Sequence, residues 1–252
     1  NIPSPINNYQ SYGNLDFGNV TGFTFQFDRR RTKNLELNLT YTLQFANGSG
    51  SDANSSRNIN TRGPIRNLVP LSFDERHRVT AVVDYRYASG KNYDGPVIGG
   101  LKIFENAGIT FTTLAVSGRP YTRNQIPSQY GGSGFVGELN GSRLPWTFNV
   151  DLRADKRITI KPSKDARPLN ANIYFRVQNL LNTKNVKGVY GATGSPDNDG
   201  YLLSELGQDR VDDVINTNRG IDAFLDAYSW GLLSPGNFFF PRRMYLGLTF
   251  DF

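Results

Sequence analysis

The only histidine of the chain, His77, lies where acid–base chemistry could be assembled. Asp74, Glu75 and Arg76 directly precede it, so carboxylates adjoin an imidazole, the side chain most often used as a general base. Nucleophilic catalysis would also need a residue such as serine on a glycine-framed turn, and the sequence contains no such motif. A hydrogen-bonded histidine at the start of a strand is the better interpretation. We therefore expect that the protein is not an enzyme.

A second group with possible chemistry is the sequence Ser-Pro-Asp-Asn-Asp-Gly, which contains Asp197, Asp199 and Gly200. Its spacing resembles the start of a calcium loop, but such a loop also needs a glutamate at a fixed later position. Glu205 does not stand at that position, so an ordinary turn is the better interpretation. The chain has no cysteine, which excludes disulfides and thiolate metal sites. We expect neither a metal nor a cofactor.

Carboxylates also occur at polar positions of several segments that have the pattern of β-strands. They are Glu36, Asp84, Asp151 and Asp155. Two such groups could form the carboxylate pair of a glycoside hydrolase. Arginines at similar positions offer a simpler explanation, namely ion pairs across one polar face. They are Arg78, Arg86, Arg153 and Arg176.

The elements that carry these side chains alternate strictly between apolar and polar residues. In 33–46 the apolar positions are Leu35, Leu37, Leu39, Tyr41, Leu43 and Phe45. Successive side chains of a strand point to opposite faces, so this segment has one apolar and one polar face. Residues 242–252 repeat the pattern and end on an aromatic residue. Both runs exceed the usual strand length of about five or six residues.

Seven segments show this alternation, and we predict one strand in each. They are 18–30, 33–46, 77–88, 104–117, 147–160, 169–181 and 242–252. The long links 47–75, 118–146 and 184–241 alternate with shorter ones, as in outer-membrane barrels. A short helix is expected within 212–228. The predicted fold is all-β: residues 1–252 form the C-terminal part of one transmembrane antiparallel β-barrel domain.

An incomplete barrel has open edges that cannot face lipid, so we expect earlier strands in the same protein. The first residue, Asn1, and the only methionine, Met244, also suggest a piece of a longer chain. No run approaches the ~18 apolar residues of a membrane helix, which leaves strands as the way to cross a bilayer. The net charge of +6 is spread along the chain, which argues against nucleic-acid binding.

Several of these segments carry a resemblance to a known family. They read FDERHRVTAVVDYRY at 73–87, TFNVDLRADKRITI at 147–160, LNANIYFRVQNLLNTKNVKGVYGATGSPDNDGY at 169–201 and PRRMYLGLTFDF at 241–252. The chain resembles the C-terminal barrel of TonB-dependent outer-membrane receptors, of the Oar-like or SusC-like type of the Bacteroidetes. The most specific points are Phe175, Val177, Asn179, Leu180, Asn182 and Phe252.

The resemblance implies a barrel of about 22 strands with an N-terminal plug, both completed by residues outside this chain. It implies active import across the Gram-negative outer membrane, driven by the TonB complex through the plug. It also implies that the barrel-assembly machinery reads Leu248, Phe250 and Phe252 as an insertion signal. Lipids are the expected surroundings, and a surface lipoprotein lid is a further expected partner.

Aromatic and basic residues in the outer links are the candidate ligand-facing side chains. They are Tyr121, Arg123, Tyr130, Trp146, Tyr190, Tyr201 and Trp230. Some of these aromatics could instead be interface anchors. Two alternatives remain open: a passive porin or adhesin barrel without energy coupling, and a soluble all-β domain. The sequence does not identify the substrate.

Overall fold

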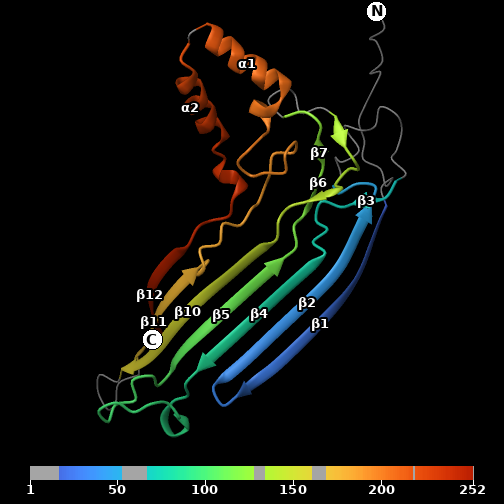
Figure 1. The fold of residues 1–252 in the computed structure, drawn as a ribbon. Helices are drawn as coiled ribbons and strands as arrows, with labels where there is room; N and C mark the ends of the chain where they lie inside the picture. Colours follow the sequence, from blue (N-terminus) through green and yellow to red (C-terminus); the bar gives the residue numbers. More distant parts are fainter. Residues whose placement is uncertain (1–16, 53–66, 128–133, 161–168, 218, 252) are drawn as a thin grey trace, which may run out of the picture.

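Seven long antiparallel strands form a single sheet in the computed structural model, which describes residues 17–52, 67–127, 134–160, 169–217 and 219–251. They are β1 (Gly18–Thr32), β2 (Leu35–Gly48), β4 (His77–Arg86), β5 (Ala107–Val116), β10 (Thr147–Ile160), β11 (Leu169–Gln178) and β12 (Arg243–Asp251). Each predicted segment overlaps one of them, and β1 and β2 each extend two residues beyond the predicted end. The order in the sheet is the order in the chain, with β1 and β12 at the two edges (Figure 1). The all-β prediction is confirmed at the level of an antiparallel sheet.

Short elements lie in the links between the long strands. They are β3 (Val69–Pro70), η2 (Gly90–Asn92), β6 (Pro120–Tyr121), β7 (Arg123–Asn124), β8 (Phe135–Val136), β9 (Ser142–Arg143), η4 (Tyr201–Leu203), α1 (Glu205–Asn216), α2 (Ile221–Leu232) and η5 (Pro235–Asn237). The turn between β1 and β2 and the link between β4 and β5 lie at the same end of the sheet as the C-terminus (Figure 1). The described parts of the longer links and both helices lie at the opposite end.

The single helix predicted within 212–228 is wrong in extent, because two helices occupy this region. The first helix begins after Ser204, whose side chain caps it by accepting a hydrogen bond from the backbone N–H of Gly207. The second begins after Gly220, which has a φ of +73°. Glycine adopts this left-handed conformation readily, so the chain can turn sharply between the two helices. The apolar spacing alone did not reveal that break.

The strand register gathers the apolar residues on one face of the sheet. One row of directly paired residues crosses six strands, namely Leu37, Val83, Phe111, Leu152, Val177 and Met244. The adjacent row on the opposite face is Glu36, Asp84, Thr110, Arg153, Arg176 and Tyr245. We call these two surfaces the apolar face and the polar face. Val82, which breaks the alternation, pairs with Asn38 and Thr112 on the polar face.

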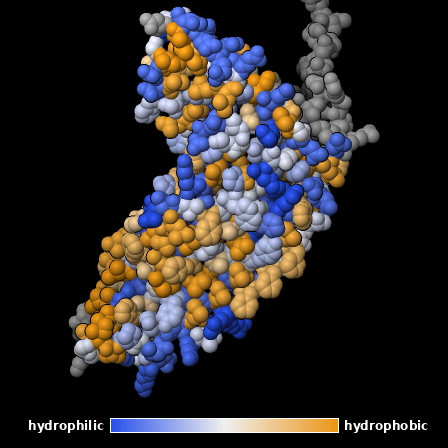
Figure 2. Space-filling view, in the orientation of Figure 1, coloured by the Kyte–Doolittle hydropathy of each residue, from blue (hydrophilic) through white to orange (hydrophobic). Residues whose placement is uncertain are grey.

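The apolar face is uncovered across the described part of the chain. The two helices contact each other and η4, and neither packs on the sheet. Exposed fractions reach 59% for Phe23 on β1 and 79% for Leu246 on β12. Figure 2 shows hydrophobic side chains gathered over the sheet in this view, with hydrophilic ones along the lower rim. Such an extended exposed apolar surface is unusual for a protein surrounded by water.

Very few hydrophobic side chains are buried. Among the described residues they are Ala46, Leu71, Val116, Ala171, Val177 and Val214. They do not form one contiguous core of the kind that stabilises a soluble domain of this size. None of the described helices is both long enough and apolar enough to cross a membrane.

Candidate functional site

An asparagine-rich junction joins the ends of three strands where the last long link begins. Asn179, directly after β11, adopts a left-handed φ of 52°. Its backbone N–H donates to the Asp151 carboxylate on β10 at 2.9 Å. Its side-chain amide donates to the carbonyl oxygens of Thr183 at 3.0 Å and Phe240 at 3.2 Å. One residue therefore connects β10, the turn after β11 and the segment that leads into β12.

The neighbouring asparagines extend this junction. Asn182 also has a left-handed φ, and its side-chain oxygen accepts from the backbone N–H of Arg242 at 3.0 Å. The side-chain oxygen of Asn185 accepts from the Phe148 N–H at 2.9 Å, and its side-chain amide donates to the Phe148 carbonyl at 2.8 Å. Asparagine tolerates the left-handed region better than most residues and offers both a donor and an acceptor. The Asn-Leu-Leu-Asn-Thr-Lys-Asn sequence therefore fixes how the link leaves the sheet.

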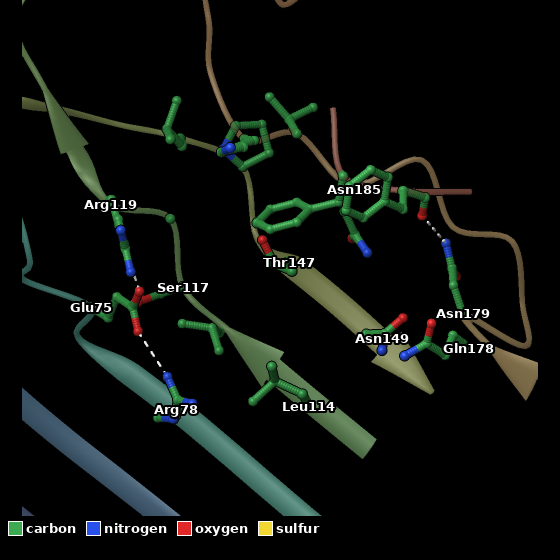
Figure 3. Close-up of a pocket in the computed structure, with 18 of the residues that line it drawn as sticks. Glu75, Arg78, Leu114, Ser117, Arg119, Thr147, Asn149, Gln178, Asn179 and Asn185 are labelled. Atoms are coloured by element: carbon green, nitrogen blue, oxygen red, sulfur yellow. Dashed lines mark hydrogen bonds and ion pairs between the residues drawn. The ribbon is translucent and has the colours of Figure 1, made fainter. Parts of the chain in front are cut away.

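A cavity of about 480 Å³ lies between this junction and the start of β4, at the long-link end of the polar face. Its apolar part includes Leu114, Val116 and Phe240, and its polar part includes Asn149 and Gln178. Figure 3 shows Asn179 and Asn185 on one side of the cavity and Glu75 with its two arginines on the other. Volumes of roughly 300–1,000 Å³ are typical of sites for small ligands. We call this cavity the outer pocket.

The outer pocket contains more cations than carboxylates. The cations are Arg78, Arg119, Lys187 and Arg243, and the carboxylates are Glu75 and Asp151. Glu75 accepts from Arg78 at 3.1 Å and from Arg119 at 2.7 Å. Asp151 is held by Asn149 and the Asn179 N–H. No described carboxylate pairs with Lys187 or Arg243, and the Arg243 guanidinium lies 3.7 Å from the centre of the Phe240 ring.

A buried carboxylate holds the rim of this end of the sheet. Asp74 is 1% exposed and accepts from the backbone N–H of Ala46 at 2.9 Å. Its other oxygen pairs with Arg143 of β9 and lies 3.5 Å from the Arg76 Nε. The same Arg143 donates to the backbone carbonyls of Asp74 and Gly118. These contacts tie the link between β5 and β10 to the end of β2.

The candidate ligand-facing residues that the structure describes do not line the outer pocket. Both sequence neighbours of Trp146 line the pocket, but the Trp146 ring stacks on His77, with ring centroids 5.7 Å apart. The Arg123 guanidinium donates to the Ala192 carbonyl at 3.4 Å, and the Tyr190 hydroxyl donates to the Leu232 carbonyl at 3.1 Å. The first contact connects β7 to the link after β11, and the second connects that link to α2. Tyr130 is outside the described residues.

Of the remaining three candidates, two belong to the helical part of the last link. Tyr201 of η4 packs against Tyr228 of α2, with ring centroids 5.5 Å apart, whereas Trp230 is 74% exposed. Tyr121 lies in β6, paired with β9. The structure thus distributes these candidates over several loops. The residues that do line the pocket come largely from strand ends, where the alternation predicted polar positions but not a cavity.

The chain bends at Asp197–Gly200 as predicted, and local hydrogen bonds hold it: the Asp197 carboxylate accepts from the Ser195 hydroxyl, and the Asn198 side chain accepts from the Gly200 N–H. The carboxylate of Asp199 accepts from the N–H of Tyr201 at 3.0 Å and from the Tyr228 hydroxyl. Burial of the phenol and this hydrogen bond raise the pKa of Tyr228. Within the described segments, no three His, Asp or Glu side chains are grouped so as to hold a metal ion.

His77 has the structural role that the sequence favoured over acid–base chemistry. It is the first residue of β4, and its Nδ1 shares a hydrogen bond of 2.9 Å with the Tyr41 hydroxyl. Its backbone N–H donates to Ser117 Oγ at 2.9 Å. The preceding carboxylates bind arginines instead, as Asp74 and Glu75 do above.

The expected ion pairs on the polar face are partly present. Asp155 accepts two hydrogen bonds from Arg86, at 2.7 and 2.8 Å, and Asp84 lies 3.6 Å from the same guanidinium. Glu36 and Asp84 also bind Arg31, which the sequence did not single out. The expected pairing of Asp151 with an arginine is wrong, because its oxygen is occupied by Asn149 and the Asn179 backbone. No described carboxylate pairs with Arg176.

The proposed assembly residues lie at the C-terminal edge of the sheet. Leu248 and Phe250 belong to the apolar face of β12 and are about half exposed, at 51% and 48%. Phe252 is outside the described residues. Comparison with protein-family models, with curated proteins and with solved structures finds no match to this chain.

Proposed function

We propose that this chain forms part of a transmembrane β-barrel of the Gram-negative outer membrane and that the barrel imports a substrate by TonB-dependent transport. The observation that carries the membrane part is the uncovered apolar face, which runs through seven strands in register. In a bilayer, hydrocarbon chains would cover this face, so its apolar side chains would not be exposed to water. The polar face would then line the lumen.

Two aromatic groups near the ends of β4 support the same proposal. The first is the stack of Tyr41, His77 and Trp146 at the long-link end. The second contains Tyr85 and Tyr87 at the short-link end, in edge contact at 5.3 Å. From His77 to Tyr85 the strand rises about 26 Å, or about 20 Å along the membrane normal at a tilt of ~40°. Barrels carry aromatic girdles on either side of an apolar band about 25 Å tall.

The open edges support the presence of further strands. In the described sheet, β1 and β12 each pair with one neighbour only. An unpaired backbone N–H or C=O in hydrocarbon costs several kcal/mol, so both edges need partners in a bilayer. The proposed function therefore requires further barrel strands at both edges. It also requires a plug in the lumen and the barrel-assembly machinery.

Energy coupling rests on the resemblance in the F-x-V-x-N-L-x-N segment and in the last strand. The asparagine junction gives that segment a physical role, because it anchors the longest link above the outer pocket. A pocket and large links at the same end suit capture of a ligand from outside the cell. In this proposal, the substrate is captured at the long-link end, and the plug controls its passage through the lumen.

Membrane location is tested by fractionating cells that express the full protein carrying this chain. The protein should sediment with outer membranes, resist extraction by high salt and urea, and dissolve in detergent. Recovery in a soluble fraction without detergent would overturn the membrane part of the proposal.

Import is tested separately from location. In planar bilayers the purified full protein should give no steady ion conductance, because a plug would fill the lumen. A stable open channel of nanosiemens size would instead support a passive porin. Removal of the plug segment should convert the silent protein into such a channel.

A further inference from the structure

Two arginines face each other directly on the polar face, in the part of the sheet formed by the last strands. Arg153 of β10 and Arg176 of β11 are Cα partners in the antiparallel register. Like charges in directly opposed positions destabilise a sheet pair. Arg153 lies 4.0 Å from Asp155 and over the ring of Tyr174, at 4.8 Å. Arg176 has no carboxylate partner among the described residues.

Two further arginines extend this positive charge on the polar face, one along β10 and one on β12. Arg157 lies four residues along β10 from Arg153, and Arg243 lies diagonally across from Arg176 on β12. Neither has a described carboxylate within ion-pair distance. The four arginines therefore lie in one column over three strands, with Asp155 between Arg153 and Arg157. We call this set the arginine column.

The nearby carboxylates are already occupied by other partners. Asp155 is bound in bidentate fashion by Arg86. Asp84 is shared by Arg31, Arg86 and the Thr110 hydroxyl. Asp151, which lies diagonally from Arg176, is bound by Asn149 and by the Asn179 backbone N–H. Among the described residues, the one ion-pair contact of the column is therefore that of Arg153 with Asp155, at 4.0 Å.

Cavities lie at both ends of the column. Arg243 contributes to the outer pocket. At the other end, Arg86, Arg153 and Arg157 line a cavity of about 390 Å³ together with Asp155 and Asn172. Three guanidinium groups there face one carboxylate, which Arg86 already binds. Arginine presents planar pairs of donors that match the oxygens of phosphate and carboxylate groups.

We propose that the arginine column is a binding path for an anionic solute that carries phosphate or carboxylate groups. This inference rests on the proposed function, because it takes the polar face as the wall of the lumen, and it adds the charge class of the substrate. The solute would bind first near Arg243 in the outer pocket. It would then move along the polar face, over Arg176 and Arg153, to the cavity beside Arg157.

The proposal predicts opposite effects of the arginines with and without an anion. Without one, Arg153 and Arg176 repel each other, so Arg153→Gln or Arg176→Gln should leave the melting temperature of the full protein unchanged or higher. With an anion bound, the pair contributes to binding, so each variant should bind inorganic phosphate about tenfold more weakly.

The experiment uses the full protein in detergent micelles, with sodium chloride replaced stepwise by sodium phosphate at constant ionic strength. Calorimetric melting and titration of phosphate are measured for the wild type and both variants. Arg210→Gln on the exposed surface of α1 is the matched control and should bind phosphate like the wild type.

Equal stabilisation of the wild type and both variants by phosphate would overturn the proposal. So would a marked fall in melting temperature of the variants without phosphate, because a carboxylate elsewhere in the protein would then be the partner of the column. Both results leave the membrane location intact, since fractionation and detergent extraction test that independently.

Discussion

Asp74 illustrates how a single buried charge organises the long-link end. Its carboxylate is occupied by a backbone N–H and by Arg143, and it is almost completely shielded from water. The sequence placed Asp74 next to His77 and so suggested acid–base chemistry. The actual partner, Arg143, lies 69 residues away and could not be found from local spacing.

Asp74→Asn should lower the free energy of unfolding by about 2–3 kcal/mol, because Arg143 would remain part-buried without its counter-charge. The link between β5 and β10 should also become more sensitive to protease. Unfolding in denaturant and limited proteolysis measure the two effects. Asp197→Asn is the control, since that carboxylate is 65% exposed and 3.9 Å from Lys184. Equal effects of both substitutions would contradict the role of Asp74.

Asn179 combines a left-handed backbone with side-chain hydrogen bonds, and substitutions can separate these two contributions. Asn179→Gly keeps the conformation accessible and removes the side-chain bonds, each worth about 1 kcal/mol. Asn179→Ala should cost about 1 kcal/mol more, because alanine is strained at a φ of 52°. Denaturant unfolding of both variants measures the difference. If the alanine variant were the more stable of the two, the assigned backbone role would be wrong.

At the scale of elements, alternation predicted all seven long strands, because each strand has one mainly apolar face and one mainly polar face. The boundaries shifted by a few residues, as in β2, predicted at 33–46 and observed at Leu35–Gly48. The helical hairpin was less predictable, since its exposed surface carries Trp230 and other apolar residues that blur the helical pattern. The outer pocket depends on pairings between distant links, which period and composition do not encode.

The contact between η4 and α2 should depend on pH through Tyr228. Its pKa is raised in the folded protein, so the fold favours the neutral phenol. This stabilisation is fully present below the ordinary tyrosine pKa of about 10 and is lost as the pH rises through the higher folded value. Near-ultraviolet circular dichroism should therefore show loosening of the hairpin above that range.

Tyr228→Phe provides the control for this titration. The variant should lose the most alkaline tyrosine in a phenolate absorbance titration and should lack the associated change in dichroism. A titration identical to that of the wild type would show that Tyr228 is not the group concerned.

At the scale of the whole molecule, the two faces of one strand should tolerate a charged side chain to different degrees. Ala81 belongs to the apolar face of β4 and Val82 to the polar face, although they are adjacent. In a bilayer, Ala81→Lys near the middle of the strand should cost about 2–4 kcal/mol, whereas a lysine near the interface costs about 0–1 kcal/mol. Val82→Lys should have a much smaller effect because it would enter the lumen.

The comparison is made by unfolding the full protein from lipid vesicles with guanidinium chloride. Leu43→Lys, at the level of His77, serves as the interfacial control. Equal costs at Ala81 and Leu43 would indicate that the apolar face is buried against protein and not against a bilayer with a hydrocarbon centre.

The most direct test of the central claim is the accessibility of spin labels along β4 in lipid vesicles. The chain has no cysteine, so single cysteines at positions 79 to 83 can each carry one label without competing thiols from this chain. We expect high collision rates with oxygen for labels at 79, 81 and 83, and high collision rates with a water-soluble nickel reagent for labels at 80 and 82. Oxygen collision should be greatest near 81. Equal access of the nickel reagent to both sets of positions would contradict a lipid-facing sheet.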